Sequence, residues 1–468
     1  MPEEKHLQRR LGLFATIASA VGLMVASTTL VSSGQGFAAG GAGFIIPLVL
    51  AMIFNVFVAF TYSELSGLIP KAGGINHYTE AALGKFWAII AVLGAYIVPL
   101  VFAASAEAAL PGLVITQAWI PDVDYRLIST LIVVFLVVVN LLGVQLFAAV
   151  QMFTTVSMMG SILVLGIIGF TTNSPNVIPD AYDPFNPLGW GVLALLGLGF
   201  WLFIGTEFVT PLAEEIKRPQ RNIPLGMILG LVIIVICAGV YGLGSIRVTP
   251  LDLLRDSPTP HVDMAEGILG QAGMIWMTIV TILASVTTVN TLICGTSRFL
   301  YGMSLREQAP RALSNLSKRG VPWIGILLCG VVIEIVMATG VATADAFLIL
   351  ILASMVCYCV SYIIAHIDVI VLRTRYPKLH RPFRSPLFPI PQILSMGAMV
   401  YMIYAVYPDP DITKAVWIRA GIIMGVIAIY AILWVKVYKK KPLFKAVPIE
   451  ELTEQIEEEL GPKEIPIP

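Results

Sequence analysis

Charged side chains are scarce in this sequence. They make up 12% of the 468 residues, whereas hydrophobic residues make up 57%. A soluble domain usually carries roughly 25% charged residues. The 29 basic and 29 acidic residues give a formal net charge of zero, so no nucleic-acid partner is predicted. This composition excludes a series of water-soluble domains and indicates a protein that lies in the lipid bilayer.

Metal ligands and redox residues are also few. The five cysteines all fall in apolar segments, where a free thiol serves as a small apolar residue: Cys237, Cys294, Cys329, Cys357 and Cys359. The sequence contains no disulfide framework, no zinc pattern and no motif of a membrane-embedded enzyme. We therefore predict no cofactor, no metal site and no enzymatic activity. His366 and Asp368 do not share a helix face, and we interpret them as residues of a helix end near the membrane interface.

Long apolar runs dominate the chain. Crossing the hydrocarbon takes about 20 apolar residues, and about twelve such segments can be placed here. Their predicted starts are Leu11, Gly43, Phe86, Ile128, Phe147, Leu188, Ile223, Ala272, Trp323, Phe347, Pro389 and Val416. The predicted fold class is an all-α polytopic membrane protein. Residues 1–11 and 438–468 are expected to be cytoplasmic, and "IEELTEQIEEELG" in the second of these is expected to form a short acidic amphipathic helix.

Lysine and arginine accumulate on one side of the predicted spans. If the spans alternate in direction, that side receives the Arg298–Arg319 and Arg373–Arg384 groups and both chain ends. The other side receives only Arg126, Arg247, Arg255, Lys414 and Arg419. Because basic residues mark cytoplasmic loops, we predict a multi-pass protein of the cell membrane with both termini in the cytoplasm.

Two spans contain residues that weaken a helix. The stretch "WLFIGTE", Trp201–Glu207, places a glycine and a carboxylate inside an apolar run. A carboxylate at the bilayer centre costs about 2.5 kcal/mol or more, so a function is expected for it. The first span has small and hydroxyl residues from Gly22 to Thr28, which would also suit close helix packing. Weak points in the first and sixth spans are typical of transporters with inverted repeats and discontinuous helices.

Broken helices would suit an amino acid as substrate. They free backbone groups, which are tolerated in a membrane only where they line a cavity or bind a ligand. A half-helix N-terminus favours a carboxylate and a half-helix C-terminus favours an ammonium group. An α-amino acid carries both groups.

Three stretches resemble the amino acid–polyamine–organocation (APC) family of permeases. "ELSGLIPKAGGINHYTEAALG", from Glu64, is similar to the family's block at the end of the second span. "FWLFIGTEFVTPLAEEIKRPQRNIP", from Phe200, is similar to its sixth-span block, and "SRFLYGMSLREQAP", from Ser297, to the end of its eighth span. The resemblance extends from about Gly12 to Val437 and implies a LeuT-type fold. Residues 12–172 and 188–372 would be five-span inverted repeats, and residues 389–437 two peripheral helices.

The resemblance also implies substrate-binding residues. In the first span Ala26, Ser27 and Thr28 match a loop that binds the substrate carboxylate, but both glycines of the family's loop are replaced. This departure keeps non-standard amino acids and amines open as substrates. The sixth-span residues with an implied role are Trp201, as an aromatic cap over the substrate, and Phe203, Ile204 and Gly205, as the unwound stretch. Trp201 could instead be a packing aromatic.

Coupling residues are implied by the same comparison. Glu207 matches a carboxylate implicated in proton sensing, although it could instead be a hydrogen-bond acceptor that holds the broken helix. A lysine that replaces sodium in some members is absent, because its position is Met158 here. A possible ion site lies at Ser285, Thr287 and Thr288. Two other intramembrane carboxylates compete with Glu207. Glu107 could line an outer vestibule, whereas Glu334 has no evident partner and is better explained by packing or by a position at the interface.

The predicted function is secondary active transport of amino acids across the cytoplasmic membrane, with proton-coupled symport placed first. Exchange of amino acids for amines or polyamines comes second, and sodium coupling third. A nutrient-sensing receptor that binds without turnover remains an alternative of another class.

Overall fold

The fold was analysed in a computed structural model. It describes residues 7, 9–98, 103–118, 120, 122–173, 176–257, 259–339, 344–407, 410–449 and 451. This part of the chain is built of helices, and its one β-type pairing is a bridge between Leu11 and Ile216. Of the predicted acidic helix near the C-terminus, only Ile449 and Glu451 belong to the described residues.

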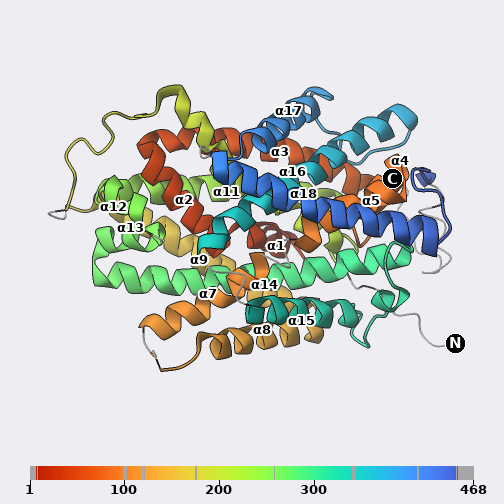
Figure 1. Ribbon diagram of the computed structural model, residues 1–468, viewed down its shortest axis with the longest axis horizontal. Helices are drawn as coiled ribbons and strands as arrows, with labels where there is room; N and C mark the ends of the chain where they lie inside the picture. The colour runs from red at the N-terminus through yellow and green to blue at the C-terminus, as the bar shows by residue number, and fades with distance from the viewer. Residues whose placement is uncertain are drawn as a thin grey trace.

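The first half of the chain begins with an interrupted helix. Its elements are α1 (Leu13–Met24), α2 (Ser27–Gly40), η1 (Gly41–Phe44), α3 (Ile45–Leu68), α4 (Ile75–Leu83), α5 (Lys85–Val92), η2 (Leu93–Ile97), α7 (Ala103–Ala118), α8 (Tyr125–Leu142) and α9 (Val144–Thr171). The short α4 lies between the second and third predicted spans. Figure 1 shows α4 and α5 at one end of the molecule and α12 and α13 at the opposite end.

The second half begins with another interrupted helix. Its elements are η3 (Gly189–Leu195), α10 (Leu196–Trp201), η4 (Thr206–Leu212), α11 (Pro219–Ile246), α12 (Leu251–Asp256), α13 (Pro260–Leu269), α14 (Gln271–Leu305), η5 (Arg311–Ser314), α15 (Trp323–Thr339), α16 (Ala344–Arg375), α17 (Ile390–Tyr404), α18 (Pro410–Ile432) and η6 (Leu433–Tyr438). Eight described segments are long and apolar enough to cross a membrane, and four more apolar helices are shorter. These segments overlap the predicted spans, and Ser27–Leu68 holds both the second half of the first predicted span and the second span.

Small residues allow the central helices to approach closely. α11 packs against α9, α1 and α3. A Cβ atom on Gly166 of α9 would lie 2.7 Å from the Cα of Tyr241, and one on Gly244 of α11 would lie 2.3 Å from the carbonyl oxygen of Gly166. Only glycine fits at such a crossing, which is the usual way for helices to associate in lipid.

Buried ion pairs hold the α4 end of the molecule together. Glu80 of α4 accepts hydrogen bonds from Arg306 and Gln308 and pairs with Lys85 at 3.1 Å. Burial alone would raise the pKa of Glu80, but Lys85 and Arg306 offset burial and hold that pKa below its ordinary value. Nearby, Arg298 of α14 forms a pair with Glu215 at 3.0 Å in which both side chains are 1% exposed.

The N-terminal segment closes over the same end. The backbone N–H groups of Arg10 and Leu11 donate to the carbonyl of Glu215, and the N–H of Lys217 donates to Leu11. These bonds attach the start of the chain to the loop that follows η4. The sixth span and the N-terminal segment are therefore linked directly.

The prediction for His366 and Asp368 is wrong. Both residues are fully buried within α16 and do not lie at an exposed helix end. His366 Nδ1 lies 2.8 Å from the hydroxyl of Thr61, and Thr79 donates to Asp368 at 2.6 Å. The sequence spacing gives no sign of these partners, because α3 and α4 supply them from 305 and 289 residues away.

Candidate functional site

The first span is broken between α1 and α2. α1 ends at Met24, and Ala26 has the extended conformation (φ −71°, ψ 156°) before α2 begins at Ser27. The predicted interruption at Ala26–Thr28 is therefore present, centred one or two residues earlier. The C-terminus of α1 and the N-terminus of α2 face the same break, with partial charges of opposite sign.

The sixth span is broken after Trp201, where α10 ends. Gly205 has the left-handed conformation (φ +107°, ψ 0°), and the 3₁₀ helix η4 follows it. A Cβ atom at Gly205 would lie 2.4 Å from Cδ2 and 2.8 Å from Cβ of Leu23 in α1. The two breaks thus pack directly against each other, as the sequence predicts, and glycine is needed here for both its conformation and its size.

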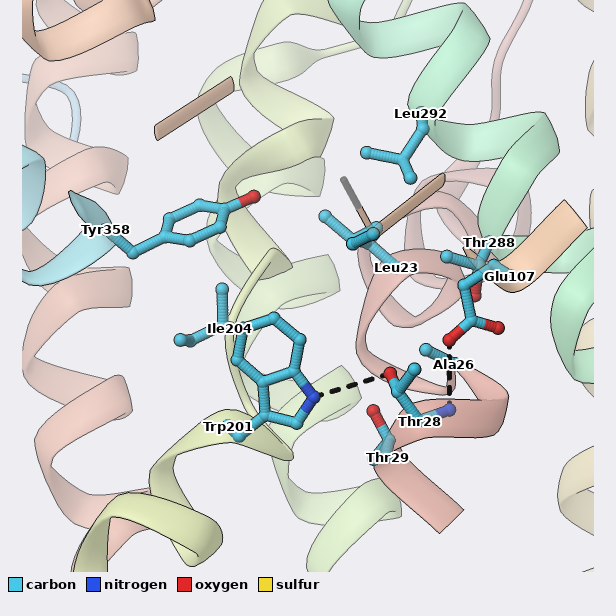
Figure 2. A pocket seen from close by; sticks show the side chains of 11 residues that line it. Leu23, Ala26, Thr28, Thr29, Glu107, Trp201, Ile204, Thr288, Leu292 and Tyr358 are labelled. Carbon is cyan, nitrogen blue, oxygen red and sulfur yellow. Dashed lines mark hydrogen bonds between the residues drawn. The ribbon is translucent and has the colours of Figure 1, made fainter. Parts of the chain in front are cut away.

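A cavity lies between the two breaks. Figure 2 shows the Trp201 indole and the Tyr358 ring on one side of it and Glu107 on the other. The lining residues are Leu23, Ala26, Thr28, Thr29, Ala103, Glu107, Trp201, Ile204, Thr288, Leu292 and Tyr358. Its volume, about 30 Å³, would hold water but no amino acid. A bound amino acid would therefore require the lining residues to move apart.

Trp201 links the two broken spans. Its indole Nε1–H donates to the hydroxyl of Thr28 at 3.4 Å, and its side chain is buried against the cavity (Figure 2). An aromatic face here can contact the apolar part of a ligand and attract a cation. This position suits the predicted cap over a substrate.

The carboxylate of Glu107, in α7, lies against the N-terminus of α2. Oε2 accepts hydrogen bonds from the backbone N–H of Ser27 at 3.0 Å and from the Ser27 hydroxyl at 2.5 Å. Oε1 accepts one from the backbone N–H of Thr28 at 2.9 Å. The Ser285 hydroxyl lies 3.4 Å from Oε2, and Glu107 is fully buried. The sequence suggested an outer vestibule for this residue, whereas the structure places it at the helix break.

Glu207 lies just beyond the second break and is fully buried. Its Oε2 accepts a hydrogen bond from the Tyr362 hydroxyl at 2.8 Å, and that hydroxyl also accepts from the N–H of Gly205 at 3.3 Å. Its Oε1 has no hydrogen-bond partner among the described residues. Through Tyr362, the carboxylate is therefore connected to the backbone of the broken span at Gly205.

The possible ion site is only partly assembled. Ser285, Thr287 and Thr288 all lie on α14 and are buried. The Thr288 hydroxyl donates to the carbonyl of Gly22 in α1 at 3.4 Å, and Ser285 contacts Glu107. The Thr287 hydroxyl has no partner within the described part of the chain. The hydroxyls of Ser285 and Thr288 thus reach the first break from α14.

Five residues of the predicted set line the cavity: Ala26, Thr28, Trp201, Ile204 and Thr288. Ser27 contributes through its bonds to Glu107, whereas Phe203 is buried elsewhere and does not line the cavity. Sequence reasoning missed Tyr358 and Tyr362. Their spacing of four residues on one apolar helix was the available signal, since it places two phenolic groups on one face.

Two other expectations concern residues away from the cavity. Met158, at the position of the missing lysine, is buried in α9. Glu334 of α15 has a partner after all, because the Thr130 hydroxyl of α8 donates to it at 2.8 Å. Glu334 is therefore part of a peripheral contact between two helices.

Comparisons with known proteins agree with this architecture. Residues 11–429 match the family model described as amino acid permease. The chain is 24% identical over 455 residues to the branched-chain amino acid permease BcaP of Bacillus subtilis, with 90% of this chain and 93% of the relative covered. It is 25% identical over 446 residues to the methylthioribose transporter of the same organism, with the same coverage.

A solved transporter has the same fold. The structure of a Na⁺-coupled sialic acid symporter superposes with a TM-score of 0.59 at 12% identity, covering 88% of this chain and 90% of that one. The expected LeuT-type helical fold is thereby confirmed. The chain is a multi-pass membrane transport protein and not an enzyme, and it belongs to the amino acid permease family.

Proposed function

We propose that the chain is a secondary active transporter that carries an amino acid or a related amine across the cytoplasmic membrane, with protons coupled through Glu207. The family match and the paired helix breaks around a cavity support this function. Among the relatives, the D-serine/D-alanine/glycine transporter of Escherichia coli is 25% identical over 439 residues. The methylthioribose transporter is named for a substrate of another kind, so the substrate is not fixed by family membership.

The observation that carries the proton coupling is the environment of Glu207. Four buried tyrosines interact with its charge: Tyr62, Tyr96, Tyr358 and Tyr362. Tyr362 donates to Oε2 of the carboxylate at 2.8 Å, and Oε1 lacks a hydrogen-bond partner among the described residues. A buried carboxylate without a cationic partner is costly to keep ionised, so a proton at this position changes the energy of the conformation that buries it.

A proton on Glu207 would act through the helix break. It can shift the equilibrium between outward and inward states only as far as its affinity differs between them. A difference of one unit in pKa between those states corresponds to about 1.4 kcal/mol, or a tenfold shift. Tyr362 binds both Glu207 and the backbone of Gly205. Protonation of Glu207 would therefore change the hydrogen bonding at the break in the sixth span.

The test is transport by Glu207→Gln in proteoliposomes. Glutamine can still accept the bond from Tyr362 but cannot take up a proton. With the most stabilising member of a panel of amino acids and their decarboxylated amines, we expect the variant to lose most of its pH dependence between about pH 5 and 8. Counterflow should survive better than proton-driven accumulation, because exchange needs no net proton movement.

A matched control is Glu334→Gln, which neutralises an intramembrane carboxylate in the peripheral α8–α15 contact. This variant should keep the wild-type pH profile. If Glu207→Gln also keeps that profile together with full accumulation, Glu207 is a structural residue and proton coupling through it is excluded. A folded protein that binds these ligands but never exchanges them would be a receptor.

A further inference from the structure

We propose that Glu107 makes this site selective for a primary amine with an apolar body, a substrate that lacks the α-carboxylate of an amino acid. This inference rests on the proposed transport function and specifies its substrate class. The juxtaposition that carries it is the Glu107 carboxylate seated on the N-terminus of α2, at the wall of the cavity (Figure 2).

The place where a substrate carboxylate would bind is already filled. The first N–H groups of a helix have no partner within it, and they attract anions. At the break these are the N–H groups of Ser27 and Thr28, and both donate to Glu107. An amino acid would have to displace Glu107, leaving that carboxylate buried without its donors and beside a second anion. Both consequences are unfavourable.

The rest of the site attracts a cation. None of the eleven lining residues is Lys, Arg or His, and Glu107 is their one carboxylate. The C-terminus of α1 at Met24 directs the negative end of a helix dipole to the same break. Trp201 lines the cavity with an aromatic ring, which attracts cations over its face. The buried Tyr358 hydroxyl has no partner among the described residues and can accept a hydrogen bond from an ammonium group.

The remaining walls favour an apolar body with one charge. Leu23, Ala103, Ile204 and Leu292 supply aliphatic surface around the cavity. A second ammonium group would find no second carboxylate in this lining, and an unpaired buried charge is strongly disfavoured. A monoamine with a branched aliphatic chain therefore fits better than a diamine or a polyamine.

The test compares an amino acid with the amine that its decarboxylation gives. Leucine and isopentylamine form one pair, and valine and isobutylamine another. Binding to the purified protein is measured from the increase in melting temperature with ligand concentration, and turnover is measured by counterflow in proteoliposomes. We expect each amine to bind at least tenfold more tightly than its amino acid and to be exchanged.

Two variants and a control locate the effect. Glu107→Ala removes the carboxylate and exposes the N–H groups of Ser27 and Thr28, so amine affinity should fall at least tenfold and amino acid affinity should rise. Glu107→Gln keeps the size of the side chain, and should also lose amine affinity; it replaces Glu107→Ala if that variant does not fold. Glu334→Gln should keep the wild-type preference.

The outcomes separate this inference from the transport function. Leucine binding as tightly as isopentylamine to the wild-type protein overturns the amine assignment, and counterflow of leucine would then leave the transport function standing. Amine binding without any counterflow supports the selectivity of Glu107 and rejects transport. A folded protein that binds neither member of either pair overturns the assignment.

Discussion

Replacing Gly205 by alanine tests whether the two helix breaks form one unit. The new Cβ atom would lie within 2.8 Å of three side-chain atoms of Leu23, including its Cβ, which cannot move away without moving α1. Left-handed backbone costs a residue other than glycine about 1–2 kcal/mol, and overpacking a core costs about 1–3 kcal/mol. We expect Gly205→Ala to destabilise the closed arrangement by about 2–5 kcal/mol in total.

Two readouts measure this effect, the melting temperature in detergent and substrate uptake in proteoliposomes. Both should fall in Gly205→Ala. The matched control is Gly160→Ala, at an exposed position inside α9 where a new Cβ atom meets nothing within 4 Å. That variant should be neutral, or more stable by up to about 1 kcal/mol, because alanine favours a helix. If Gly205→Ala keeps both the wild-type melting temperature and wild-type uptake, the breaks do not depend on each other as described.

Two further predictions concern Trp201 and Glu307. Trp201→Ala should weaken ligand binding at least tenfold, about 1.4 kcal/mol, with partial recovery in Trp201→Phe, and an unchanged dissociation constant in ligand-induced stabilisation would rule out the cap. The hydrogen bond from Lys441 holds the pKa of Glu307 below its ordinary value, and Lys439 adds to this. The resulting stabilisation is complete above the ordinary carboxylate pKa of about 4.3 and is lost as pH falls through the lower folded-state pKa. Limited proteolysis beyond residue 439 should therefore increase at acid pH, and a Glu307→Gln variant with the same pH dependence would contradict this assignment.

The positions of the spans and of both breaks could be predicted because their signals are local. A long apolar run predicts a membrane-spanning segment. Small or β-branched residues near Ala26 and Gly205 predict a helix that is easily interrupted there. Family resemblance then related these two places to each other. The structure places the first break one or two residues earlier, because the terminal turns of a helix fray and its boundary residues are weakly defined.

The partners of the buried polar groups could not be predicted from the sequence. Glu107 meets Ser27 across 80 positions of chain, and His366 meets Thr61 across 305. Such contacts depend on how helices rotate and cross, and neither hydropathy nor spacing records that. Sequence alone therefore identifies Glu107 as an intramembrane carboxylate but predicts a vestibule for it, and it predicts a helix end for the two buried residues of α16.

The Arg298–Glu215 and Arg306–Glu80 pairs give the α4 end an unusual response to its surroundings. An apolar seal is strengthened by salts that are excluded from protein surfaces, whereas ion pairs that become exposed are screened. Opening this end would return four charged groups to water, and their hydration would offset much of the pairing energy that is lost. We therefore expect the net free energy of opening the α4 end to be small. Salt in the compartment that faces α4 is then expected to change how readily this end opens, whereas the cavity between the breaks, which no Lys, Arg or His lines, should respond less.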